Sequence, residues 1–145
     1  MARVFAQEDG NLNKRPITTQ RSRSYSDIDL TFAKKGSGDV FKKTDAAAVK
    51  QSVKNLLMTN HGEKPFDHSF GGDLHRFLFE LEDVDTFEVE DIIMNALARY
   101  EPRAIFRGVD VNPNPDRNAI SVLVKFQVIN VPEILEINVN ITRLR

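Results

Sequence analysis

Few residues in this chain could carry out catalysis or bind a metal. The 145 residues include no cysteine, which excludes disulfides, thiol nucleophiles and cysteine-ligated zinc. The only imidazoles are those of His61, His68 and His75, spaced every seven residues. An unbroken helix would place them nearly on one face, but Pro65 and Gly71–Gly72 interrupt any helix in this region. We therefore expect no metal site and no cofactor.

Carboxylates are the remaining candidates for chemistry. Glu80 and Glu101 could form the acid and base pair of a glycosidase, a reaction that uses two carboxyl groups on either side of the bond. The acids from Asp83 to Asp91 crowd the start of a predicted helix, where negative charge is favourable next to the helix dipole. We expect these acids to be solvated or capping and the protein not to be an enzyme. A muramidase-like hydrolase is the alternative.

The most informative charged residues lie in the segment Tyr100-Glu101-Pro102-Arg103. Proline disfavours helical geometry at the residue before it, so a helix must stop near Tyr100 and the chain must leave it extended. Residues two apart in an extended segment point to the same side, which brings Glu101 and Arg103 together. The two form either a local ion pair or a recognition point in which Arg103 is free to bind a partner carboxylate.

Three amphipathic helices precede this segment. The first begins at Thr44 or Asp45, either of which could cap it, and the third runs from Asp85 to Arg99 with Asp85 and Glu88 in capping-box spacing. A shorter helix lies between them. Their apolar residues recur with helical spacing at Val49, Val53, Leu56 and Leu57, then Leu74, Phe77, Leu78 and Leu81, then Val89, Ile92, Ile93, Ala96, Leu97 and Tyr100.

After Pro102 the apolar period changes to two, which predicts three strands. Ile105, Val109 and Val111 should share one face of the first strand; the second and third span 119–129 and 134–143. The links at 112–118 and 130–133 are too short for parallel crossovers, so the strands should form an antiparallel meander. The predicted class is α+β: three helices packed on a small antiparallel three-stranded C-terminal meander, with an extended N-terminal arm.

The last strand ends without proline or a bulge signal to protect its edge, at Asn138, Val139, Asn140 and Ile141. An open edge of this kind could pair with a strand of another chain, although edges are more often covered.

The chain divides into an extended arm (1–24), a start segment with a flexible Gly/Ser linker (25–43) and one α+β domain (44–145). Net charge is −1, yet residues 1–43 carry nine basic and five acidic side chains, whereas 72–101 carry two and nine. The overall balance argues against a generic polyanion binder, although a basic arm that binds an acidic protein or nucleic acid is a third interpretation. We expect a partner surface to order the arm, and neither a membrane helix nor a secretory signal.

Read together, four features resemble the baseplate wedge and sheath-initiator family of contractile phage tails and type VI secretion baseplates. They are Tyr25–Asp29, Gly62–Asp67 with Phe70–Leu74, Tyr100–Arg103, and the closing three-strand meander. The resemblance runs from Tyr25 to the C-terminus. His68 and Lys64 stand where relatives often have proline and arginine. Residues 1–24 and Gly36–Gly38 look longer than the compact form of the family, which leaves the role of the arm open.

The resemblance implies a structural protein of the virion tail baseplate, assembled in the host cytoplasm, in six copies. Glu101, Pro102 and Arg103 would contact the helical core bundle of the wedge, and the strand edge at 138–141 would initiate assembly of the tail sheath. Implied partners are other wedge proteins, the sheath protein and tail tube or hub proteins, with no membrane and no nucleic acid. Some relatives carry a lysozyme label.

Overall fold

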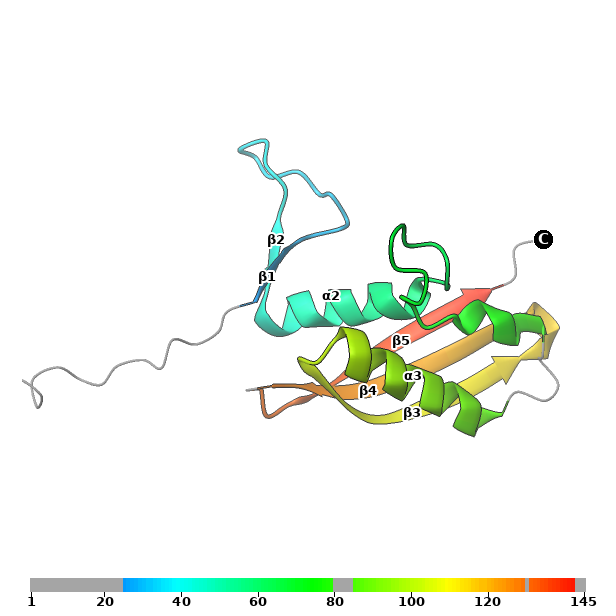
Figure 1. Cartoon of the computed structure of the whole chain (residues 1–145). Coiled ribbons are helices and arrows are strands. Elements are labelled where there is room, and N and C mark those ends of the chain that lie inside the picture. Colours follow the sequence, from blue (N-terminus) through cyan, green and yellow to red (C-terminus); the bar gives the residue numbers. More distant parts are fainter. Residues whose placement is uncertain (1–24, 80–84, 130, 143–145) are drawn as a thin grey trace, which may run out of the picture.

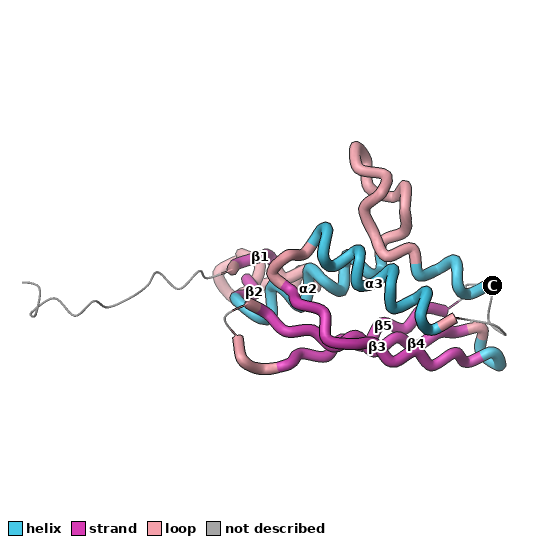
Figure 2. The backbone as a smooth tube through the Cα atoms, turned by 60° about the horizontal axis from the view of Figure 1, so that its bottom comes forward, coloured by secondary structure: helices cyan, strands magenta, loops and turns pink. Residues whose placement is uncertain are grey.

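The computed structural model describes residues 25–79, 85–129 and 131–142; the arm predicted at 1–24 lies outside these ranges. Helices α2 and α3 lie across one face of a three-stranded sheet, as Figures 1 and 2 show from two directions. The elements are β1 (Ser26–Ile28), β2 (Lys42–Thr44), α2 (Asp45–Met58), the 3-10 helix η1 (Leu74–Phe79), α3 (Thr86–Tyr100), β3 (Ala104–Asn114), the 3-10 helix η2 (Pro115–Arg117), β4 (Ala119–Val128) and β5 (Ile134–Thr142). The predicted α+β class of helices on a three-stranded antiparallel sheet is confirmed.

Strand β4 is the centre of the sheet, antiparallel to β3 on one side and to β5 on the other. Its side chains alternate, and all of those on the helix-facing side are buried: Ile120, Val122, Val124, Phe126 and Val128. Each such side chain stabilises the fold by about 1.5–3 kcal/mol relative to an exposed one. The predicted meander and the alternation of its second strand are therefore confirmed.

The first strand differs from its predicted pattern because β3 contains a bulge. Arg107 is an extra residue between the pairs that Phe106 and Gly108 make with β4. An extra residue reverses the alternation of side chains beyond it. Ile105 is consequently exposed on the outer side, whereas Val109 packs against the core. The prediction that Ile105 shares a face with Val109 and Val111 is wrong. β3 also continues to Asn114, into the region predicted as a loop from residue 112.

Helix α2 packs its predicted apolar stripe onto the sheet, with Val49, Val53 and Leu57 fully buried. Its start differs from the prediction. Thr44 makes no side-chain cap hydrogen bond, and the carboxylate of Asp45 accepts a hydrogen bond from the Tyr25 N–H at 3.3 Å. Neither of the two predicted side-chain caps is present, and the Asp45 carboxylate instead binds the residue that precedes β1.

Helix α3 begins as predicted, since the Asp85 carboxylate accepts from the Phe87 N–H at 2.9 Å. The other half of the capping box is replaced. Glu88 forms an ion pair with Arg76 of η1, which ties the start of α3 to the preceding helix. η1 buries its predicted apolar residues as a 3-10 helix, and the predicted member Leu81 lies outside the described residues.

The loop between α2 and η1 stands out from the helical layer (Figure 2). Its return to the domain depends on Gly71, which has φ +126° and whose backbone lies so close to the end of α2 that a Cβ would be 2.3 Å from the Thr59 carbonyl oxygen. Gly72 then donates its N–H to the Leu56 carbonyl at 3.1 Å. Gly71 thus lies where both the backbone angle and the available space require glycine.

Within the described part of the chain, no helix has the length and apolarity needed to cross a bilayer.

We predict that Gly71→Ala lowers the free energy of unfolding by more than about 1 kcal/mol, because alanine disfavours this φ and its methyl group would clash with backbone. Gly36→Ala is the matched control, since a Cβ there has no neighbour within 4 Å. Urea denaturation followed by circular dichroism measures both. Equal midpoints for the two variants would show that the loop does not need this conformation.

Candidate partner-binding site

The Glu101-Pro102-Arg103 corner connects α3 to β3. α3 ends at Tyr100, as the proline predicts, and the Glu101 N–H donates to the Leu97 carbonyl at 2.9 Å. The Ala104 N–H then donates back to the Glu101 carbonyl, also at 2.9 Å. The corner is thus closed by backbone hydrogen bonds on both sides of Pro102.

The two charged side chains of this corner bind each other. Arg103 Nε lies 2.5 Å from Glu101 Oε1 and Nη2 lies 2.9 Å from Oε2, a bidentate pair. Ser52 of α2 donates its hydroxyl to Glu101 Oε2 at 2.5 Å. Glu101 is 4% exposed, whereas the Arg103 side chain is 35% exposed. Glu101 is therefore an internal group that positions Arg103, and Arg103 is the member of the pair that reaches the surface.

Arg103 also contacts the start of the described chain. Its guanidinium carbon lies 5.0 Å from the centre of the Tyr25 ring, within range of a cation–π interaction. The hydrogen bond to Glu101 raises the pKa of Arg103, and the charge of Asp27 acts in the same direction. Tyr25 therefore belongs to the same surface as the corner, although some 75 residues separate them along the sequence.

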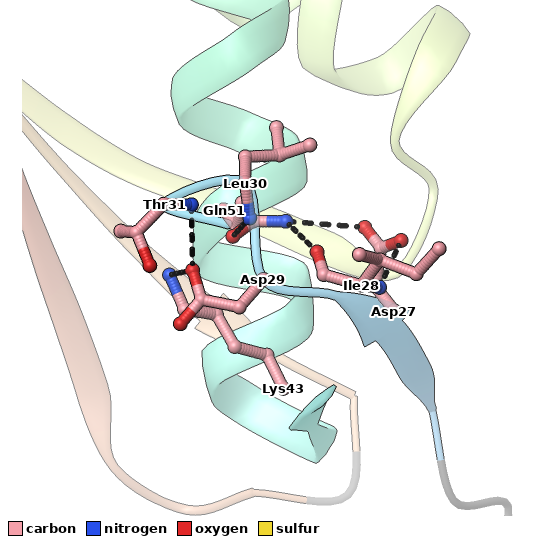
Figure 3. Close-up of polar contacts among 7 residues, drawn as sticks. All are labelled: Asp27, Ile28, Asp29, Leu30, Thr31, Lys43 and Gln51. Atoms are coloured by element: carbon pink, nitrogen blue, oxygen red, sulfur yellow. Dashed lines mark hydrogen bonds and ion pairs between the residues drawn. The ribbon is translucent and has the colours of Figure 1, made fainter. Parts of the chain in front are cut away.

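The segment that follows Tyr25 is fixed on α2 by a buried glutamine (Figure 3). Gln51 Nε2 donates to the Ile28 carbonyl at 2.8 Å and contacts Asp27 Oδ2 at 3.5 Å, and its Oε1 accepts from the Leu30 N–H at 3.3 Å. The role of Gln51 could not be predicted from the sequence, since a single glutamine on a helix carries no signal of a distant backbone partner. The two-stranded sheet in which β1 pairs antiparallel with β2 was likewise not predicted.

A second local contact of this segment involves Asp29. The Thr31 N–H donates to Asp29 Oδ1 at 3.0 Å, and Lys43 Nζ of β2 lies 3.2 Å from the same oxygen. The Thr31 hydrogen bond, assisted by Lys43, lowers the pKa of Asp29. This contact links the turn after β1 to β2, so that the two short strands and α2 form one unit (Figure 3).

The second candidate surface is the free edge of β5. In the described ranges β5 pairs with β4 alone, through nine consecutive residue pairs without a bulge. Val139 and Ile141 are buried on the helix side, whereas Asn138 and Asn140 are exposed on the other face. A partner at this edge would thus meet the backbone of the four predicted residues and the side chains of only the two asparagines.

The structure does not bring the two candidate surfaces together. Arg103 precedes β3, and β3 and β5 are the opposite edges of the sheet. The corner therefore leads into the edge strand that β4 separates from β5.

Catalytic and metal-binding alternatives receive little support from the geometry. Both carboxylate oxygens of Glu101 accept hydrogen bonds, and its predicted catalytic partner Glu80 lies outside the described residues. No group of three or more His, Asp or Glu side chains that could hold a metal occurs in the described ranges. His61 instead lies 3.8 Å from Asp73.

Comparisons with known proteins agree on one family. The family described as baseplate wedge protein gp25 matches residues 43–133 of the chain. Baseplate wedge protein gp25 of Enterobacteria phage T4 is 34% identical over 116 residues, which are 79% of this chain and 88% of that protein.

Two solved structures are similar in fold. A chain of the anti-feeding prophage baseplate, solved by cryo-EM with 6-fold symmetry, has a TM-score of 0.57 at 21% identity, covering 81% of this chain and 84% of the other. A putative tail lysozyme from Geobacter sulfurreducens has a TM-score of 0.53 at 17% identity, covering 67% and 89%. At such identities the likeness concerns the fold alone.

We predict that Arg103→Ala lowers the free energy of unfolding by about 1–3 kcal/mol, because it leaves the buried Glu101 carboxylate without its cation. Adding Glu101→Gln should recover part of this loss, since a neutral amide needs no counter-charge. Arg107→Ala, at an exposed arginine of β3, should change stability by less than about 0.5 kcal/mol. Thermal and urea denaturation of the three variants tests the pair, and a double variant no more stable than Arg103→Ala would contradict it.

Proposed function

Because the chain belongs to the gp25 family of baseplate wedge proteins, and so is a structural protein of contractile-tail baseplates, we propose two specific contacts for it. It docks on a neighbouring wedge protein through the Glu101–Arg103 corner. It then offers the free edge of β5 as the template on which the first strand of the tail sheath is added.

Docking through Arg103 is supported by the asymmetry of the ion pair. Glu101 is buried and uses its carboxylate internally, so it holds the guanidinium plane in one orientation. A guanidinium has five N–H donors, and the two hydrogen bonds to Glu101 leave others for a partner carboxylate. A helical bundle that carries Asp or Glu at this point is therefore the partner we propose. Tyr25, stacked against the guanidinium, would be buried in the same contact.

The template role is supported by the difference between the two edges of the sheet. β3 carries a bulge at Arg107 and a proline at Pro113, two devices that discourage pairing with another strand. β5 has neither within its nine residues. Pairing at such an edge uses main-chain hydrogen bonds and makes little demand on the side chains of the partner.

We further propose that six copies surround the tail tube. They would be assembled in the host cytoplasm before they become part of the virion baseplate. Support for the copy number is the 6-fold symmetry of the anti-feeding prophage baseplate, one chain of which has a similar fold. The corner and the template lie at different strands of the sheet, so the protein can contact a wedge partner and the sheath with different residues. Tail tube or hub proteins are further neighbours in this proposal.

We propose no hydrolase activity, because Glu101 is buried and hydrogen-bonded through both of its oxygens. A general acid needs an oxygen within reach of the substrate. Turnover of peptidoglycan by the purified chain, abolished by Glu101→Gln, would overturn this part of the proposal.

Docking predicts that the folded double variant Glu101→Gln, Arg103→Ala is recovered in purified wedges at least about tenfold less than wild type, since it lacks the guanidinium that meets the partner. This variant is preferable to Arg103→Ala alone, which leaves a buried charge unpaired. Arg107→Ala is the matched control and should be incorporated normally. Normal incorporation of the double variant would contradict a docking role for the corner.

The template role predicts that a proline on β5 blocks sheath assembly on finished baseplates. Successive N–H groups of a strand point in opposite directions. One of the two variants Asn138→Pro and Val139→Pro therefore removes a hydrogen bond to β4, and the other removes an N–H from the free edge. The variant that keeps its cooperative unfolding should assemble baseplates but no sheath by electron microscopy. Sheaths of normal length on that variant would contradict the role of β5.

A further inference from the structure

A groove of about 380 Å³ lies beside β5, between α2 and the turn that follows β1. Leu30 comes from the turn, Ala47, Lys50 and Lys54 come from one face of α2, and Ile137 comes from β5. Thr31, Lys43, Gln51 and Asn55 complete the lining. The walls thus combine apolar side chains and polar groups with the aliphatic stems of Lys50 and Lys54, whose ammonium groups can remain in water.

The two helix lysines of this groove have no ion-pair partner among the described residues, in contrast to Lys43 on the neighbouring strand, which is paired with Asp29. Lys50 and Lys54 are both exposed and are four residues apart, one helical turn, so their charges repel each other. This face of α2 is therefore a site of uncompensated positive charge.

The groove lies where a strand added to β5 would place half of its side chains. Ile137 is a buried residue of the helix-facing side of β5, and the groove reaches it. An added strand would lie about 4.8 Å from β5 and alternate its side chains between the two faces of the sheet. The helix-facing half would point to Lys50 and Lys54, and the other half would lie beside Asn138 and Asn140.

We propose that this groove selects an acidic strand: the segment that pairs with β5 carries Glu or Asp at alternate, helix-facing positions, whose carboxylates bind Lys50 and Lys54. The inference rests on the proposed role of β5 and adds the chemistry of the partner. Glutamate fits best, because its methylenes can pack on Leu30 and Ala47 while its carboxylate reaches an ammonium group.

Charge argues against two other occupants. Residues 1–24 of the same chain carry five basic and two acidic side chains, so Lys50 and Lys54 would repel most of this arm. A second copy paired edge to edge through β5 would bring its own unpaired lysines to the same interface. The remaining occupant is a different chain with acidic residues in strand spacing.

Two ten-residue peptides that alternate threonine with either glutamate or glutamine test the inference against the full chain. Binding is measured by fluorescence anisotropy at low salt. The glutamate peptide should bind about tenfold more tightly than the glutamine peptide, and raising the salt should remove the difference. Lys50→Glu with Lys54→Glu should abolish the preference. Lys34→Glu with Lys42→Glu, the same charge change at exposed lysines outside the groove, should retain it.

The fold-preserving proline variant of β5 separates the inference from the proposed function. In one outcome, the proline weakens binding, but both peptides bind equally and Lys50→Glu with Lys54→Glu has no effect. This outcome would overturn the selection of an acidic strand and leave the template role in place. Glutamate-selective binding that the proline does not weaken would show an acidic ligand that is not an added strand, which would overturn the proposal as stated. Absence of binding by the glutamate peptide would also overturn it.

Discussion

A carboxylate enclosed by protein needs a cation and hydrogen-bond donors, and the Glu101 carboxylate receives these from separate parts of the chain. Ser52 donates from α2, and Arg103 donates from the other side of Pro102. Arg103 in turn lies over Tyr25, whose N–H is bound by Asp45 at the start of α2. A single buried charge therefore connects the two helices, the first strand of the sheet and the segment that enters the domain.

The features that could be predicted from the sequence are those that depend on neighbouring residues alone. The strict alternation of β4 predicts its buried face without help from any other element, and the proline after Glu101 predicts the end of α3. The spacing of Glu101 and Arg103 predicts that their side chains lie on one side of the chain, which the ion pair confirms, but it leaves open whether Arg103 is paired locally or free for a partner.

The remaining features depend on contacts between distant residues. Gln51 and Ser52 form their hydrogen bonds with segments more than 20 residues away, and nothing in their neighbourhood in the sequence signals this. β1 and β2 have three residues each and no apolar period, so only pairing with each other and contact with α2 defines them. The bulge at Arg107 places Ile105 on the opposite face from Val109. It could not be predicted, because a single inserted residue in an otherwise regular strand leaves no mark in the sequence except the adjacent Gly108.

In the part of the chain that the structure describes, helices cover one face of the sheet and leave the other uncovered, so the two sides of the free edge of β5 differ. Main-chain hydrogen bonds alone would accept a strand shifted by one residue as readily as one in register. With α2 on one side and water on the other, such a shift would exchange the environments of all the side chains of the strand. The helices on one face would therefore fix the register of a strand added to β5, because only one register places its side chains in the environments that suit them.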